Sequence, residues 1–195
     1  MKRIISVLLL AVICIFAVSC GDKNEVKTPD GMKQISDKDD LFYLFVPNNW
    51  TADRGYGNPY AYVSGEDNSN VTVMFYILDK ETVEPDSSAE NPKEPYIDAY
   101  WKEFEASLEN GFLAYSLSET ESNSKTTLDS LYSKQYVYTV KTKDKEEYKC
   151  RSVVTYHGEM IFCLTYTAET PNYDLHKADV DKIIAEFKFK DGLLG

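Results

Sequence analysis

Three strand-like segments near the end of the chain constrain its fold more than any other feature of the sequence. Leu131–Thr142, Glu146–Tyr156 and Glu159–Ala168 are rich in Tyr, Val, Ile and Thr, which suit a pleated, half-buried surface. The last two flank His157-Gly158, whose glycine fits the positive φ of a compact hairpin turn. This part of the chain is therefore predicted to form an antiparallel meander.

Shorter segments upstream have the same character and are separated by turn-forming residues. Pro47 stops the first of them, and the stretch 65–70 separates the second from the third. We expect strands at Leu41–Val46, Tyr60–Ser64, Val71–Leu78 and Tyr115–Glu121. Thr51–Pro59 and the acidic Glu81–Glu94 are expected to be loops, and the second is too long for a simple connection.

Two other segments have helical periodicity. The first opens at Pro95 and runs to about Asn110, and the second runs from about Tyr173 to Phe187. Apolar residues recur at helical spacing at Ile97, Trp101, Phe104 and Leu108, and again at Val180, Ile183, Ile184 and Phe187. Strands, a helix, a meander and a second helix predict one α+β domain over residues 41–190, in which helices flank a central antiparallel sheet.

The N-terminus has the layout of a bacterial lipoprotein signal. Lys2 and Arg3 precede an apolar run of 15 residues, Ile4–Val18, and Ser19 stands before Cys20. The run is shorter than the roughly 20 residues of a membrane-spanning helix. We expect residues 1–19 to be a signal peptide and Cys20 to carry the lipid. Ordinary signal cleavage at the same bond and an uncleaved anchor remain as alternatives.

The segment after the signal and the charge of the chain bear on its partners. Residues 20–40 are polar, charged and poor in aliphatic side chains, so they are expected to form a flexible tether. The formal charge of −11 becomes −13 once Lys2 and Arg3 leave with the signal. Nucleic acid and anionic head groups repel so acidic a chain. Membrane attachment is therefore expected only through the lipid on Cys20.

Two cysteines remain after the signal and Cys20 are accounted for. Cys150 and Cys163 lie on adjacent predicted strands, and an exported protein favours a disulfide. With His157-Gly158 as the central turn residues, however, Cys150 lies diagonally from Cys163, a separation that only marginally suits the 4.4–6.8 Å between bonded Cα atoms. Both the bonded and the free state stay open, and either is structural.

The two ends of the predicted domain resemble the PsbP-like domain family, which is named after an extrinsic protein of photosystem II and also occurs in bacterial lipoproteins. The motifs are Phe42-x-x-x-Val46-Pro47-x-x-Trp50 at the start and Ile161–Thr165 leading to Ile184-x-x-Phe187 at the end. The resemblance covers about residues 41–189 and implies an α/β/α sandwich. It places no functional residue on this chain and does not support a photosynthetic role.

The residues offer little catalytic chemistry. A nucleophile–base pair needs a histidine, and His157 and His176 are both expected to be solvated at the surface. The motifs of common hydrolases, metalloproteases, phosphate loops and redox pairs do not occur. We therefore predict no catalytic, cofactor-binding or metal-binding residue.

Glycines beside aromatic residues make one loop a candidate binding rim, with Arg54, Tyr56 and Tyr60 as its side chains. The leading hypothesis is a monomeric, non-catalytic, lipid-anchored extracytoplasmic domain that binds or assists an envelope protein. The alternatives are a module that binds a small ligand or carbohydrate through its Tyr-rich loops, and a hydrolase that uses carboxylates. A flat apolar patch would favour the first, a tyrosine-lined pocket the second and converging acids the third.

Overall fold

The computed structural model describes residues 26–36, 40–53, 58–78, 83, 91–122 and 126–190. The predicted signal peptide and Cys20 lie outside these residues. No helix within the described ranges is long and apolar enough to cross a membrane.

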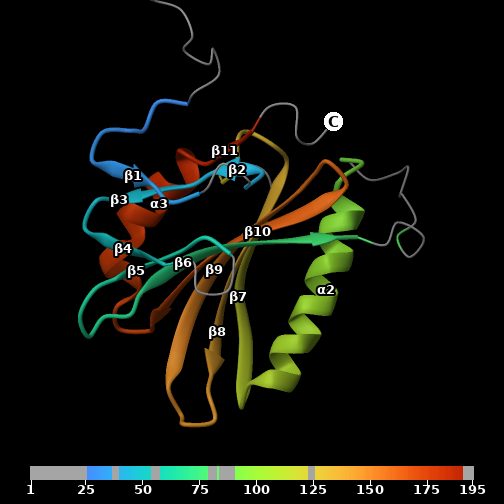
Figure 1. The fold of residues 1–195 in the computed structure, drawn as a ribbon. Coiled ribbons are helices and arrows are strands. Elements are labelled where there is room, and N and C mark those ends of the chain that lie inside the picture. The colour runs from blue at the N-terminus through green and yellow to red at the C-terminus, as the bar shows by residue number, and fades with distance from the viewer. Residues whose placement is uncertain are drawn as a thin grey trace, which may run out of the picture.

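A seven-stranded antiparallel sheet forms the centre of the molecule (Figure 1). Its spatial order is β4-β5-β6-β10-β9-β8-β7. The strands are β4 (Trp50–Asp53), β5 (Tyr60–Val63), β6 (Asn70–Ile77), β7 (Ala114–Ser122), β8 (Ser133–Lys141), β9 (Glu147–His157) and β10 (Met160–Glu169). The predicted meander is the β8-β9-β10 part of this sheet. The loop predicted over 51–59 is wrong at its start, since β4 pairs there with β5.

The turn between β9 and β10 differs by one residue from the prediction. His157 pairs with Met160, so the central turn residues are Gly158 and Glu159, with φ of 53° and 66°. A type I′ hairpin needs positive φ at both central positions, and glycine takes the first of them here. Moving the turn by one residue moves the strand register by two, which separates Cys150 from Cys163.

Helix α2 (Glu94–Gly111) covers one face of the sheet (Figure 1). Its apolar side packs on β7, β8, β9 and β10. Ile97 is fully buried, and the ring of Trp101 stacks on Tyr136 with centroids 3.6 Å apart. The periodicity seen in the sequence therefore identified the buried side of this helix.

The opposite face is covered by the last and the first of the described segments of the chain (Figure 1). A 3₁₀ turn, η2 (Tyr173–His176), leads into α3 (Lys177–Ala185), where Val180 and Ile183 are fully buried. The helix predicted from Tyr173 is thus a 3₁₀ turn for its first four residues. Layers on both faces of the antiparallel sheet confirm the predicted α+β class.

Two small sheets complete this layer and correct two predictions. β1 (Met32–Gln34) pairs with β3 (Phe45–Pro47), and β2 (Phe42–Tyr43) pairs with β11 (Lys188–Phe189). The strand predicted at Leu41–Val46 is therefore split between two sheets. The prediction of a flexible tether over residues 20–40 is wrong at β1. Met32 and Ile35 are buried in the core, and the main chain of β1 pairs with β3.

Candidate functional site

The predicted binding rim is only partly within the described residues. Arg54 and Tyr56 lie outside them, so their role stays a prediction. Tyr60 belongs to β5, where its ring lies 5.7 Å from that of Tyr62. Burial, followed by the charges of Tyr62 and Asp53, raises the pKa of Tyr60. Its described contacts are those of a strand residue.

The two cysteines are free and buried, so the structure does not contain the candidate disulfide. Cys150 pairs across the strands with Thr167, and Cys163 pairs with Val154. The cysteines are four positions apart along the ladder, about 13 Å at 3.3 Å per residue, which is well beyond disulfide reach. Burial raises the pKa of Cys150 to about 11, and burial also raises the pKa of Cys163. Both thiols are therefore protonated at neutral pH.

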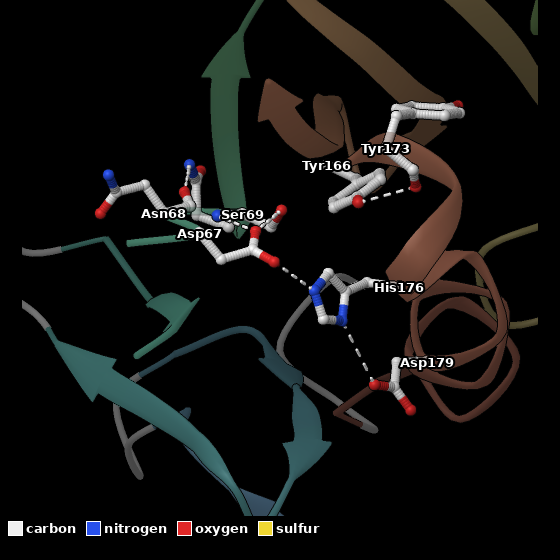
Figure 2. Close-up of polar contacts among 8 residues, drawn as sticks. Asp67, Asn68, Ser69, Tyr166, Tyr173, His176 and Asp179 are labelled. Carbon is white, nitrogen blue, oxygen red and sulfur yellow. Dashed lines mark hydrogen bonds and ion pairs between the residues drawn. The ribbon is translucent and has the colours of Figure 1, made fainter. Parts of the chain in front are cut away.

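A hydrogen-bonded histidine joins the β5–β6 turn to the start of α3 (Figure 2). His176 Nε2 lies 2.8 Å from Asp67 Oδ2, and His176 Nδ1 lies 3.9 Å from Asp179 Oδ2. The side chain of His176 is only 19% exposed, and its ring meets Trp50 edge-on with centroids 5.8 Å apart. The prediction of a solvated histidine is wrong here, because the fold brings Asp67 to it.

The hydrogen bonds among Ser69, Asp67 and His176 do not match those of a catalytic serine–histidine–aspartate triad. The hydroxyl of the fully buried Ser69 donates to Asp67, not to His176. A catalytic serine must instead pass its proton to the histidine and reach a substrate. Burial alone would raise the pKa of Asp67, but hydrogen bonds from Ser69 and His176 outweigh it and hold the pKa below its ordinary value. The cluster is suited to holding two segments together.

The second histidine is also packed. His157 ends β9, and its ring centroid lies 4.6 Å from that of Phe189. Burial and the nearby charge of Lys93 lower its pKa, although Asp129 opposes them. Among the described residues no group of three or more metal-binding side chains is brought together.

One hollow lies beside α3 and has a polar lining. Its volume is about 470 Å³, and the cations on its wall are Arg151 and Lys188. Arg151 is 8% exposed and bonds to Gln135 and Asp181, while Lys188 lies 2.8 Å from Asp129. Both cations already have carboxylate partners, so this hollow offers little free charge to a ligand.

The feature of the surface most suited to binding is the edge of β6. β5 pairs with β6 only from Asn70 to Thr72, and Val73 N–H then donates to Pro59 O at 3.3 Å. Beyond Val73, none of the residues that the structure describes pairs with β6 on this side, whereas β10 pairs on the other side as far as Ile77. Among the described residues, the central sheet therefore leaves one side of β6 unpaired at residues 74–77, and we call this stretch the β6 edge.

Apolar side chains surround the β6 edge. Met74, Phe75 and Ile77 are exposed to 37%, 45% and 81%. On the α2 side, a groove of about 560 Å³ lies between strand and helix, and the rings of Tyr76 and Tyr100 meet there with centroids 5.2 Å apart. The groove is lined by Tyr76, Ile77, Leu78, Tyr100, Glu103, Phe104 and Ser107. The sequence predicts that these residues lie on a strand and a helix. It does not predict that β5 pairs with only the first part of β6.

Known proteins match this chain only through structure. No family model and no curated protein matches its sequence. The solution structure of cyanobacterial PsbP (CyanoP) from Synechocystis sp. PCC 6803 is 16% identical, has a TM-score of 0.56, and covers 88% of this chain and 98% of its own.

Two further solved structures are similar at TM-scores below 0.5. LpqN of Mycobacterium tuberculosis, described as involved in cell envelope biogenesis, is 12% identical with a TM-score of 0.41, and the match covers 88% of this chain and 87% of LpqN. A variant of the protein Mog1 is 9% identical with a TM-score of 0.46, and covers 80% of this chain and 86% of its own. The likeness to CyanoP concerns architecture, and in that sense the chain contains a domain with the PsbP-like fold.

Proposed function

We propose that this chain is a lipid-anchored extracytoplasmic domain that binds an envelope protein and catalyses no reaction. The β6 edge carries the proposal, because exposed apolar side chains and an open strand edge occur there together. Exposed apolar patches on a folded domain mark interaction sites, and natural proteins usually protect strand edges from pairing.

The sequence before the domain supports placement at a membrane. The lipoprotein pattern ending at Cys20 predicts a diacylated N-terminus, and two acyl chains give stable anchoring where one does not. Only residues 21–31 separate Cys20 from β1. Even fully extended, a segment of that length reaches at most about 40 Å, so the domain would work close to the membrane surface. A partner in or on the same membrane is within its reach.

Site-specific photo-crosslinking in the native cell tests the binding role. A photoreactive residue replaces Ile77 at the β6 edge, and the matched control replaces Leu175, which is 68% exposed in η2. We expect one defined adduct from position 77 and none from position 175. Equal labelling at both positions, or none at position 77, would contradict the proposal.

The anchor has its own test. In the same cells, Cys20→Ser should abolish incorporation of radiolabelled palmitate and release the protein from the membrane fraction. A protein that stays bound and unprocessed would instead favour the uncleaved anchor.

A small-ligand role is the second candidate, since the groove beside the β6 edge is lined by tyrosines and its volume lies in the roughly 300–1,000 Å³ range of ligand pockets. Native mass spectrometry of the protein purified from its own membranes separates the two roles. A bound small molecule that Ser107→Trp displaces would favour the ligand, because Ser107 lines the groove.

A further inference from the structure

We infer that the partner binds by strand addition: an extended, basic segment of another protein pairs with β6 at residues 74–77. This inference deepens the proposed function and rests on it. It specifies which atoms of β6 bind, which face accepts side chains and what charge the partner carries.

The direction of the main-chain groups supports strand addition. Val73 N–H points away from β10, because it donates to Pro59 on the β5 side. Amide and carbonyl groups of alternate residues in an antiparallel strand point the same way. Phe75 and Ile77 therefore direct their N–H and C=O groups to the open side, while Met74 and Tyr76 direct theirs to β10. Two residues thus offer an added strand main-chain groups that pair with no other described residue.

The side chains around the β6 edge can accommodate the alternating side chains of an added β-strand. Successive side chains of an added strand point to opposite faces of the sheet. On one face they meet the aromatic groove beside Tyr76, Tyr100 and Phe104. On the other they lie over Phe75, whose ring centroid is 6.0 Å from that of the buried Phe162. Main-chain pairing with pockets for alternate side chains is the recognised pattern of strand addition.

The opposite edge of the sheet, β7, carries features that protect an edge strand from pairing with another chain. β7 has an irregularity between Leu117 and Glu119, and it carries Glu119 and Glu121 near its end. Bulges and charges are common devices against edge pairing. Residues 73–77 of β6 contain no charge and no proline, and their pairing with β10 is regular. The β6 edge lacks the protection that β7 has.

Charge indicates a basic occupant rather than a second copy of the chain. The full chain carries a formal charge of −11, and Glu103 lies in the lining of the groove. Two copies would repel each other, whereas Lys or Arg on a partner strand would be attracted. Glu103 and the net negative charge of the chain would both repel an acidic strand.

The experiment places the photoreactive residue at Met74 in the full chain in cells and adds a second change at Ile77. Ile77→Pro removes one N–H from the open side without removing one that β10 uses, and Ile77→Thr keeps the N–H while losing most of the apolar side chain. We expect Ile77→Pro to reduce the adduct at least tenfold and Ile77→Thr to reduce it less than threefold. Equal adduct in Ile77→Pro would overturn strand addition and leave partner binding standing. Absence of adduct in every background would overturn both.

Charge substitutions keep the inference testable if Ile77→Pro fails to fold. Ile77→Lys should lower the adduct and Ile77→Glu should preserve it, and the opposite order would overturn the basic partner. Hydrogen exchange with a synthetic peptide of alternating Lys and Val gives a direct readout. Amides 75 and 77 should exchange more slowly with the peptide, while amides 74 and 76 stay slow throughout. Binding of the peptide without that protection would overturn the pairing.

Discussion

His176 Nε2 lies 2.8 Å from Asp67 Oδ2, although 109 positions separate the two residues in the sequence. The contact joins the turn before β6 to the start of α3, and so links the central sheet to the layer that covers it (Figure 2). Because β6 provides the proposed binding edge, the pair also holds the first residues of that strand in place.

The Asp67–His176 pair should make the free energy of unfolding depend on pH in the acidic range. Its neighbours hold the folded-state pKa of Asp67 below the ordinary value, so the folded state favours the carboxylate. That contribution is present above about pH 4 and is lost as the pH falls through the folded-state pKa. We expect Asp67→Asn to lower the free energy of unfolding by about 1–2 kcal/mol at pH 7 and by less at pH 3.

Urea unfolding at the two pH values measures this difference. Asp179→Asn is the matched control, because Asp179 Oδ2 is 3.9 Å from the ring and its side chain is 43% exposed. That variant should change the free energy of unfolding by less than about 0.5 kcal/mol. An Asp67→Asn protein with the same loss at both pH values would show that its carboxylate charge is not involved.

The sequence predicted well those elements that are long enough for their hydrophobic pattern to repeat several times. The meander and α2 each repeat their pattern over nine or more residues, so the buried side can be identified before the structure is known. β1, β2 and β11 have only two or three residues, too few for a period, and they exist because neighbouring main chain is available to pair. The predicted tether was wrong at β1 for that reason.

The candidate sites depended on facts that one sequence does not contain. The Asp67–His176 contact joins two segments whose proximity follows only from the complete fold. The β6 edge depends on where β5 ends, a boundary of the kind that propensity places poorly. The strand register was missed for a local reason, because positive φ at Glu159 is unusual for a residue other than Gly, Asn or Asp. A single turn residue thus decided whether the cysteines could meet.

The aromatic contact between α2 and the sheet should contribute strongly to stability. Trp101 is 6% exposed and stacks on Tyr136, so Trp101→Ala should cost about 3–5 kcal/mol. The indole N–H of Trp101 has no hydrogen-bond partner among the described residues, so Trp101→Phe should cost well under half as much. Thermal and urea unfolding measure both values, with the exposed Lys102→Ala as control. Equal losses for Ala and Phe would contradict this account.

The cysteines should behave as two protected thiols. In the mature protein carrying Cys20→Ser, we expect a thiol reagent to react with no cysteine quickly under native conditions and with both in denaturant. The reason is the burial that raises their pKa values and excludes the reagent. A reducing agent should leave the melting temperature unchanged. Detection of fewer than two thiols in denaturant without reductant would show that the pair had been oxidised.

β1 should behave as part of the domain and not as a tether. Met32 is 5% exposed and packs in the core that contains Phe45 and Val46, so Met32→Ala should lower the free energy of unfolding by about 2–4 kcal/mol. Lys27→Ala, at an exposed position before the strand, should leave it within about 0.5 kcal/mol. Urea unfolding of the two variants compares them directly. If Met32→Ala were as stable as Lys27→Ala, residues 32–34 would contribute no folding energy, and the boundary between linker and domain would have to move toward residue 41.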